Sequence, residues 1–365
     1  MAIERMRLSS AEAQEGEESA PALSLRPTQF AQYIGQPTLI RKLKIAAEAA
    51  RRRNQTVEHI LLHGPPGLGK TTLAHVVANE MNARVHVTNG PALTRGADLI
   101  GIVQNLEQRD VLFIDEIHRL PAVVEETLYS AMEDFKIDVT IDSGLHARAY
   151  TQKIKPFTLI GATTRIGLLT GAMRGRFGLT EHLEFYSPEE LQEILRQNVK
   201  LLKLEAQDDA LKELSRRSRG TPRVANRLLR RVRDYAAVEA NGKITLEITR
   251  KSLELEGIDA LGLDSQDRSF LATLIEVYSG GPAGIDAMAA TMGEERDTLE
   301  DVIEPYLLQQ ALVTRTRQGR RATKLSYEHL GRKYVPPQEP PADETPLFDA
   351  PRDDQDEKKA GRKLR

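Results

Sequence analysis

The sequence of 365 residues contains no cysteine. This absence excludes a disulfide scaffold, thiolate zinc sites, iron–sulfur clusters and a cysteine nucleophile, so a bound metal must have oxygen or histidine ligands. Long apolar runs are absent as well. No stretch approaches the roughly 18–20 residues that a membrane span needs, and the first residues lack the apolar core of a signal peptide. We therefore expect a soluble, cytoplasmic protein without a membrane partner.

Neither sign of charge is in excess. The 51 lysines and arginines balance 53 aspartates and glutamates, so the net charge alone predicts no polyanionic partner. The 40% hydrophobic and 28% charged residues are typical of a globular protein, and they exclude collagen-like, coiled-coil and wholly disordered chains. The length suffices for two or three domains.

Both ends of the chain contain few large apolar residues. Residues 1–21 are rich in glutamate, and residues 335–365 combine proline with a dense run of charges. Such segments cannot bury enough surface to offset the entropy of ordering them, so we predict two disordered tails. The folded part is predicted to consist of three domains, at residues 22–186, 187–257 and 258–334.

Short apolar runs alternate with helix-like stretches in the first of these domains. Five runs have the composition of buried strands: residues 59–63, 85–88, 111–115, 157–162 and 183–185. Helical stretches such as 71–81 and 122–134 separate them. This alternation predicts an α/β fold with a doubly wound parallel sheet.

The remaining two domains have different patterns. Residues 187–190 (SPEE) form a capping box with proline at the first helical position, and only helical periodicity follows up to about Gly257. We therefore predict an all-helical second domain. From about Asp264, three helical stretches precede two predicted strands around a turn at Gln318–Gly319. Three helices followed by a hairpin predict a C-terminal winged helix.

Residues 64–71 (GPPGLGKT) match the pattern GxxxxGK[ST] between a predicted strand and a predicted helix. In such a loop, backbone N–H groups approach phosphate oxygens, the lysine supplies charge to the β- and γ-phosphates, and the hydroxyl of Thr71 reaches Mg²⁺. A glycine-rich turn with a chance Lys-Thr is the alternative, and it does not explain the flanking strand and helix. The predicted contacts to ATP are Gly67, Gly69, Lys70, Thr71 and Thr72.

The predicted strand at residues 111–115 ends in two acids. Parallel strands end at one edge of the sheet, so these carboxylates are expected beside the phosphate loop. We predict that Asp115 binds Mg²⁺ together with Thr71, and that Glu116 orients the attacking water, which makes the protein a hydrolase. A helix N-cap acid is the alternative. His118 is interpreted as a residue on a helix face rather than a base.

These two motifs resemble those of AAA+ ATPases, and later segments extend the resemblance. Thr163-Thr164 follow a predicted strand as sensor I residues do. Residues 173–178 (MRGRFG) resemble the arginine-finger box, and residues 220–223 (GTPR) resemble the sensor II motif. Stretches such as DVLFIDEIHRL are closer still. Over about residues 23–330, the chain resembles the RuvB family, the bacterial motors of Holliday-junction branch migration.

The resemblance assigns roles to further residues. It implies that Thr163 belongs to the catalytic set, and that Arg176 is an arginine finger for the γ-phosphate on a neighbouring subunit, with Arg174 as the alternative. Arg223 is implied to contact the phosphates of its own subunit. The residues implied to line the adenine or interface side are Leu25, Arg26, Tyr33, Ile34, Glu133, Asp134, Phe135 and Tyr186. Hinge packing at Tyr186 and a solvated helix end at Glu133 are the alternatives.

The resemblance also implies an assembly and its partners. These are a homohexameric ring that hydrolyses ATP at its interfaces, duplex and four-way junction DNA, a junction-recognising protein (RuvA-like) and a junction resolvase. The expected activity is ATP-driven branch migration in DNA recombination and repair. A predicted β-hairpin at residues 136–155 is implied to contact the junction-recognising protein, with a plain extension of the sheet as the alternative.

The wing of the predicted winged helix is basic and its preceding helix is acidic. The basic residues of the wing are Arg315, Arg317, Arg320, Arg321 and Lys324. Of these, Arg315 and Arg320 match the DNA-contacting positions of the family. Residues 294–304 hold six acids and only one arginine, so we expect the major groove to repel this helix. The prediction is sequence-independent contact with phosphates through a wing that has little other chemistry to perform. A merely solubilising hairpin is the alternative.

Clamp loaders, replication initiators and protein unfoldases are the competing interpretations. A clamp-loader subunit often carries a cysteine zinc module, which this sequence lacks. An initiator needs a sequence-reading helix, and the acidic helix contradicts that role. An unfoldase needs an exposed aromatic pore loop, and with 5% aromatic residues we find none. The basic stretch at residues 226–233 is interpreted as a solvated face or a subunit contact.

Overall fold

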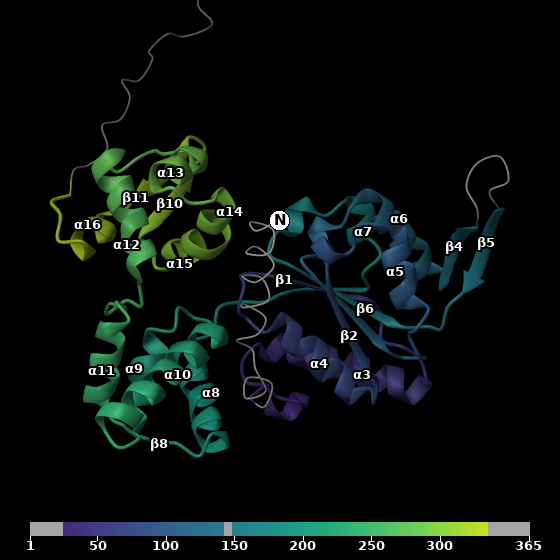
Figure 1. Cartoon of the computed structure of the whole chain (residues 1–365), viewed down its shortest axis with the longest axis horizontal. Coiled ribbons are helices and arrows are strands. Elements are labelled where there is room, and N and C mark those ends of the chain that lie inside the picture. The colour runs from purple at the N-terminus through teal and green to yellow at the C-terminus, as the bar shows by residue number, and fades with distance from the viewer. Residues whose placement is uncertain (1–24, 142–147, 335–365) are drawn as a thin grey trace, which may run out of the picture.

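The computed structural model describes residues 25–141 and 148–334, and Figure 1 shows the whole chain. The predicted tails at 1–21 and 335–365 lie outside the described residues. In the part of the chain that the structure describes, no helix combines the length and the apolar character that crossing a membrane requires.

A parallel sheet of five strands forms the centre of the N-terminal part. In the sheet order β2-β3-β6-β1-β7, the strands are Val85–Asn89, Val111–Asp115, Thr158–Thr163, Ile60–His63 and Leu179–His182. The three inner strands β3, β6 and β1 are almost wholly buried, which explains their continuous apolar sequences. The predicted doubly wound α/β sheet is confirmed.

The prediction of a strand at residues 183–185 is wrong, because the chain leaves the sheet there. Strand β7 ends at His182, and the backbone N–H of Leu183 donates one last hydrogen bond to the carbonyl of His63. As an edge strand, β7 alternates between half-buried and exposed residues and has no apolar run to mark it. Leu183 is buried in the core beyond the strand end.

Helices cover both faces of the sheet. They are η1 (Phe30–Gln32), α3 (Pro37–Arg53), α4 (Lys70–Glu80), η2 (Gly90–Ala92), α5 (Gly96–Val103), η3 (Ile117–Arg119), α6 (Ala122–Glu133), η4 (Ile166–Leu168) and α7 (Gly171–Arg174). Alternate residues of a strand point to opposite faces, so Leu62 packs with α3 and α4, whereas Leu61 packs with α5 and α6. The sheet therefore has one hydrophobic core on each side.

A two-stranded hairpin extends from the end of the sheet away from the other domains (Figure 1). Its antiparallel strands are β4 (Lys136–Ile141) and β5 (Arg148–Lys153). The hairpin predicted at residues 136–155 is thus present, and its tip lies outside the described residues.

Four helices follow the sheet and form what we call the lid. They are α8 (Pro188–Leu201), α9 (Asp208–Arg216), α10 (Pro222–Glu239) and α11 (Leu246–Leu255). Ser187 and Glu190 form the predicted capping box, with reciprocal hydrogen bonds of 3.1 and 2.9 Å. The all-helical prediction missed one short parallel ladder between β8 (Glu205–Ala206) and β9 (Lys243–Ile244). The apolar faces of the helices pack against the same core as α3 and α4.

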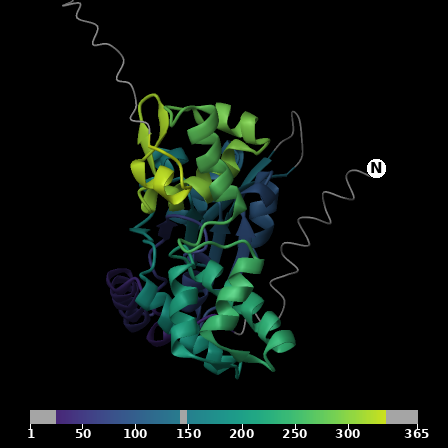
Figure 2. The same cartoon turned by 90° about the vertical axis from the view of Figure 1, so that its left-hand side faces the viewer.

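The C-terminal part is a winged helix with its own core. Its elements are α12 (Ser265–Ala272), η5 (Thr273–Val277), α13 (Ile285–Met292), α14 (Arg296–Thr298), η6 (Leu299–Ile303), α15 (Glu304–Gln309), β10 (Val313–Thr316), β11 (Gly319–Ala322) and α16 (Lys324–His329). The α14, η6 and α15 segments are continuous, and we call them helix 296–309. Figure 2 shows the winged helix stacked above the lid.

The wing hairpin turns one position earlier than predicted. The strands β10 and β11 pair Thr316 with Gly319, so the turn is Arg317–Gln318. Gly319 has φ +139°, and a Cβ there would lie 2.3 Å from the carbonyl oxygen of Ala283. This close approach explains why glycine marks the first residue of β11 and not the turn itself.

Candidate active site

The phosphate loop connects β1 to α4 and brings three parts of the chain together. Gly67 and Gly69 have φ +81° and +99°, in the region that favours glycine. A Cβ on Gly67 would lie 3.0 Å from Arg223 in the lid, and one on Gly69 would lie 2.8 Å from the hydroxyl of Tyr33. Both glycines therefore permit the backbone of the loop to lie against the lid and the N-terminal segment.

Lys70 is the first residue of α4, and its side chain is nearly buried. Its Nζ donates hydrogen bonds to the carbonyl oxygens of Gly64 (2.8 Å) and Pro65 (2.9 Å), so the ammonium lies over the loop. Burial lowers the pKa of Lys70 to about 8, although nearby Asp115 opposes the shift. Burial disfavours the protonated ammonium of Lys70, and the negative charge of a phosphate at this loop would offset that penalty.

A cavity of about 290 Å³ opens above the phosphate loop. The predicted residues that line it are Leu25, Arg26, Tyr33, Ile34, Gly67, Gly69, Lys70, Thr71, Thr72, Asp115, Glu116, Tyr186 and Arg223. These residues come from the N-terminal segment, two strand ends of the sheet and the lid. A cavity of this size, with a glycine-rich helix N-terminus on its floor, suits a nucleotide.

The two acids at the end of β3, Asp115 and Glu116, differ in their surroundings. The Asp115 carboxylate accepts a 2.9 Å hydrogen bond from the backbone N–H of Glu116. Glu116 has φ +45°, an uncommon conformation for a residue other than glycine. Its carboxylate pairs with Arg119 at 2.9 Å. Both acids line the cavity beside Lys70.

Two tyrosines also line the cavity. The hydroxyls of Tyr33 and Tyr186 lie 3.0 Å apart, and Tyr186 also donates to the carbonyl of Leu68 at 3.3 Å. Burial raises the pKa of Tyr186 to about 12, so this hydroxyl keeps its proton. A Cβ on Gly35 would lie 2.4 Å from the Tyr186 ring. The N-terminal segment and the start of the lid are therefore closely packed at the cavity.

Sequence reasoning missed the lid residues of the cavity. They are Ile194, Gln197, Asn198, Asn226 and Arg230. Asn198 is almost fully buried and donates a 2.6 Å hydrogen bond to Asn226, so α8 and α10 are linked across the cavity wall. The sequence held one indication of this site: Asn198 is polar, yet the helical spacing places it on the same face of α8 as the buried Leu191 and Leu195. Arg230 belongs to the stretch that we interpreted as a solvated face.

The two threonines after β6 have different surroundings. Thr164 lines the cavity, whereas Thr163 is fully buried behind it. The hydroxyl of Thr163 lies 2.9 Å from Nδ1 of His118 and accepts a 2.9 Å hydrogen bond from the backbone N–H of Arg165. His118, which we interpreted as a helix-face residue, lies in the short helix η3 and faces this threonine.

The residues predicted for the neighbouring subunit's nucleotide lie outside the lining of the cavity. We call this set the second cluster; it comprises Glu133, Asp134, Phe135 and Arg176, of which Arg176 and Glu133 contact one another. Arg176 pairs with Glu133 at 3.1 Å, and its guanidinium lies 4.0 Å from the centre of the Tyr129 ring. Its Nη1 donates to the carbonyl of Ala172 at 2.8 Å. Arg174 is exposed. In a single chain, Arg176 therefore has partners of its own and does not reach the phosphate loop.

The other two members of that set have separate neighbours. Asp134 ends α6 and lies 3.8 Å from Lys136. Phe135 packs its ring against His59 and Phe157, with ring centres 6.3 and 6.0 Å away. In a single chain, the ring contacts of Phe135 are therefore packing contacts.

The expectation that the wing arginines have little other chemistry is wrong. Nε of Arg315 donates to Glu304 at 2.9 Å, and Nε of Arg320 donates to the same carboxylate at 2.8 Å. Glu304 is fully buried. Burial alone would raise its pKa, but the two arginines outweigh burial and hold the pKa of Glu304 below its ordinary value. Sequence reasoning counted acids within the wing and overlooked the acid that the preceding helix places beneath it.

Fold and site together define a P-loop ATPase of the AAA+ class that carries a helical lid and a winged helix. Three family models match most of the chain: "Holliday junction DNA helicase RuvB P-loop domain" at residues 25–183, "RuvB AAA lid domain" at 186–259 and "RuvB C-terminal winged helix domain" at 260–331. The chain belongs to the RuvB family.

Individual relatives agree with this assignment. The Holliday junction branch migration complex subunit RuvB of Myxococcus xanthus is 53% identical over 325 residues, which cover 89% of this chain and 93% of the relative. The corresponding subunit of Kosmotoga olearia is 53% identical over 308 residues, covering 84% and 90%. The solved structure of the Thermotoga maritima RuvB Holliday junction branch migration motor has a TM-score of 0.79 and 47% identity, and the match covers 86% of this chain and all of that one.

Proposed function

We propose that the protein is the ATP-driven motor of Holliday-junction branch migration in DNA recombination and repair, acting in the cytoplasm as a hexameric ring that pumps duplex DNA. The observation that carries the proposal is that one cavity, in a chain of the RuvB family, combines the phosphate loop, the acid pair of β3 and the lid arginine. These groups bind, polarise and respond to a nucleoside triphosphate.

The residues of the cavity fit a magnesium–nucleotide complex. Thr71 and Asp115 offer hard oxygen donors beside the loop, and no group of three or more acids or histidines gathers anywhere in the described residues to hold a metal without help. Mg²⁺ suits this arrangement, because it is usually bound by one or two protein ligands together with substrate phosphates. When bound, the ion would neutralise charge on the β- and γ-phosphates.

We assign hydrolysis to Glu116, with Lys70 holding the phosphates. Glu116 lines the cavity just after the strand end, and its carboxylate is paired with Arg119 but remains partly exposed. A carboxylate so placed can orient a water for attack on the terminal phosphorus and accept its proton. Thr163, through His118, is proposed to report the state of this site from behind the cavity.

The second cluster is proposed to complete the site of the next subunit. Arg176, Glu133, Asp134 and Phe135 lie away from the cavity of their own chain, and they would need a neighbour to contact nucleotide. Arg176 would then exchange Glu133 for the γ-phosphate and stabilise the charge of the transition state. Arg174 is the alternative finger.

Contact with DNA is proposed through the wing. Arg315 uses two of its N–H groups for Glu304 and is half exposed, so the remaining N–H groups can reach a phosphate. Arg320 is only 13% exposed and is proposed to support that edge and contact the backbone beside it. Arg317 at the turn is exposed, with no ion-pair partner among the described residues. Phosphate contacts of this kind carry no base specificity.

The hairpin β4–β5 is proposed as the contact for a junction-recognising, RuvA-like protein, and a junction resolvase as a further partner. The support is its position, extended from the sheet away from the lid and the winged helix (Figure 1). We also propose domain divisions at residues 186/187 and 257/258, where the sheet gives way to α8 and where α11 has ended.

Imaging and turnover measurements test the proposed motor. Negative-stain images of the full chain with duplex DNA and a non-hydrolysable ATP analogue are expected to show rings that encircle DNA, and duplex DNA is expected to raise ATP turnover. Rings that form without enclosing DNA, together with a turnover that DNA leaves unchanged, would contradict it.

A further inference from the structure

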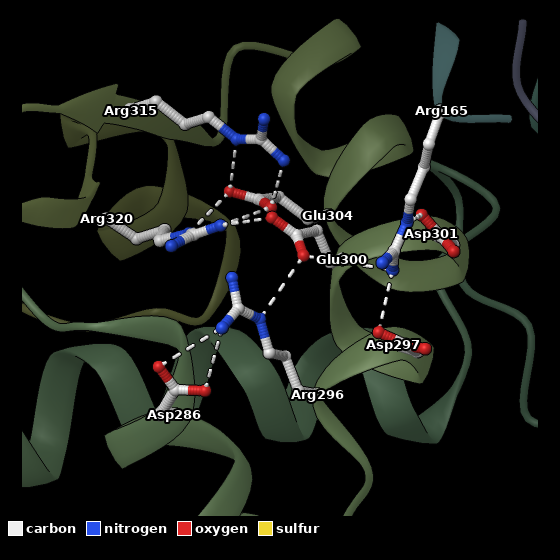
Figure 3. Close-up of polar contacts among 9 residues, drawn as sticks. All are labelled: Arg165, Asp286, Arg296, Asp297, Glu300, Asp301, Glu304, Arg315 and Arg320. Carbon is white, nitrogen blue, oxygen red and sulfur yellow. Dashed lines mark hydrogen bonds and ion pairs between the residues drawn. The ribbon is translucent and has the colours of Figure 1, made fainter. Parts of the chain in front are cut away.

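Helix 296–309 is held by two loops that border the nucleotide cavity, and it holds the wing arginines on its other side. Figure 3 shows the ion pairs around its acidic residues. Its middle turn, Leu299–Ile303, is π-helical, a rare geometry that occurs most often at functional sites. The contacts of this helix link parts of the chain that are far apart in sequence.

The first contact comes from the loop after β6. Nε of Arg165 donates to Asp301 at 2.8 Å, and Nη2 donates to Asp297 at 2.9 Å. Glu300 lies 3.8 Å from the same guanidinium. The side chains of Arg165 and Asp301 are only 23% and 27% exposed, so solvent screens this pair less than it screens surface pairs, whereas Asp297 is an exposed partner. The hydrogen bond to Asp301 raises the pKa of Arg165, which keeps its charge in any case.

The loop of Arg165 also borders the nucleotide cavity. Arg165 directly follows Thr164, which lines the cavity, and its backbone N–H binds the hydroxyl of Thr163. A movement of this loop would therefore also move the backbone that carries the guanidinium. The guanidinium is a planar fork bound at two of its nitrogens. It therefore fixes the orientation of the helix relative to the loop, in addition to attracting the acids by its charge.

The second contact comes from the loop before α10. Arg219 pairs with the fully buried Asp267 at 3.0 Å, and its Nη2 donates to the carbonyl of Val302 at 3.2 Å. Its guanidinium lies 4.9 Å from the centre of the Tyr306 ring. Arg219 precedes the GTPR motif, whose Arg223 lines the cavity. A lid movement would therefore reach the same helix at the turn after Asp301.

The far side of the helix binds the wing. Glu304 accepts hydrogen bonds from Arg315 and Arg320, and Glu300 lies 3.5 Å from Arg320. The wing therefore cannot keep its position if the helix rotates or shifts. Glu300 is also paired with Arg296, which in turn contacts Asp286 on α13, so the network extends over the winged helix (Figure 3).

We propose that Arg165 and Arg219 are positioning residues through which the two nucleotide-facing loops set the orientation of helix 296–309 and hence of the DNA-contacting wing. The inference rests on the ATPase and DNA-binding function proposed above, and it adds the route by which one controls the other. A ligand shifts an equilibrium only by its differential interaction with the two states, and these two arginines provide that difference for the winged helix.

The test compares the affinity of duplex DNA in the presence of ADP with its affinity in the presence of a non-hydrolysable ATP analogue. For the full-length wild type, we expect the two dissociation constants to differ by at least about fivefold, the lower end of usual allosteric coupling. Arg165→Gln is expected to bring their ratio to within about twofold of one and to leave DNA-free ATP turnover within about twofold of wild type. Arg165→Lys keeps the charge without the fork and is expected to lie between the two.

Two further variants keep the outcome decisive. Asp301→Asn removes the negative charge of the main partner of Arg165 and is expected to reproduce Arg165→Gln, so it replaces that variant if Arg165→Gln melts early. Arg196→Gln, the matched control, breaks comparable pairs with Asp208 and Glu193 on the lid surface, and its ratio is expected to equal that of wild type.

The possible outcomes distinguish failure of the proposed coupling from failure of the proposed ATPase and DNA-binding function. A wild-type ratio that persists in Arg165→Gln and Asp301→Asn, with or without a loss of thermal stability, would overturn the coupling and leave the proposed function intact. Wild-type protein that binds no duplex with either nucleotide would contradict the proposed function itself.

Discussion

At the scale of single residues, the catalytic assignment depends on two neighbouring acids that the same strand end presents in different ways. Asp115 remains in line with β3 and is held by a backbone N–H, whereas Glu116 turns out of the strand with a positive φ. The first geometry suits a fixed ligand and the second a group that must face a reacting water. Replacing one carboxylate oxygen of Glu116 with an amide nitrogen tests the role assigned to this residue.

Glu116→Gln is expected to retain ATP binding and to reduce hydrolysis by about tenfold to a hundredfold or more, as the loss of a general base does. The amide has the same shape, but it cannot accept the proton of the attacking water. Steady-state turnover and the dissociation constant of a fluorescent ATP analogue measure the two effects. Arg119→Gln, which removes only the partner of Glu116, serves as the control and is expected to have a smaller effect. Turnover of Glu116→Gln equal to wild type would exclude the assignment.

Lys70 makes nucleotide binding depend on pH. Burial lowers its pKa to about 8 in the free protein, and bound phosphates would raise it, because an opposite charge favours the protonated form. Above pH 8 the complex then holds more protons than the free protein, so affinity falls as pH rises, by up to about tenfold per pH unit. Nucleotide titrations from pH 7 to 9.5 measure this slope. Lys70→Arg, which stays charged, is expected to bind with a flat profile, and a flat profile for wild type would contradict the prediction.

At the scale of secondary-structure elements, helix 296–309 and the wing form one unit. The sequence predicted both elements, and it predicted the basic and acidic character of each. It could not predict that Glu304 lies beneath the wing, because the two segments meet through tertiary packing that leaves no periodic signal. The same limit applies to Thr163, since the motif marks the threonine pair but not which member faces the cavity.

Other elements were predictable to different degrees. Strands β3 and β6 are buried on both sides, so their apolar runs mark them plainly. Edge strand β7 has no such run, and its position was missed by several residues. Of the candidate site, the phosphate loop and the acid pair have local motifs, whereas the lid residues Asn198 and Asn226 meet only after the helices pack.

Arg320→Ala is expected to destabilise the winged helix by roughly 1–3 kcal/mol, because it removes two hydrogen bonds from the fully buried Glu304. Arg317→Ala, in the exposed turn of the same hairpin, is expected to change stability by less than about 0.5 kcal/mol. Urea unfolding followed by circular dichroism measures both free energies of unfolding. Equal values for the two variants would show that the ion pair with Glu304 does not stabilise the domain.

At the scale of the whole molecule, the proposed function divides the active site between two parts of the chain that lie apart in a single copy. The cavity contains the phosphate loop and the acid pair, and Arg176 lies in the second cluster with Glu133. Head-to-tail contacts between copies close into a ring when the rotation between them allows it. Catalysis at such interfaces makes activity a property of the assembly.

Mixing variant subunits tests this arrangement. Arg176→Ala and Lys70→Ala proteins are each expected to be nearly inactive, and mixtures are expected to regain part of the ATP turnover, because an intact Lys70 cavity can then face an intact Arg176. Turnover is measured across mixing ratios at constant total protein, with Lys70→Ala plus Glu116→Gln as the control that cannot restore a site of this kind. Mixtures as inactive as their parents would place the finger in the same chain or at Arg174.

The central claim is that ATP hydrolysis by this protein moves DNA junctions, and a branch-migration assay tests it most directly. A labelled four-way junction with homologous arms is incubated with the protein, a RuvA-like partner and ATP, and the conversion to two duplex products is followed by gel. We predict rapid conversion with wild type, and none with Glu116→Gln or with a non-hydrolysable analogue. Conversion that proceeds equally without hydrolysis, or that wild type fails to accelerate while hydrolysing ATP, would contradict the account.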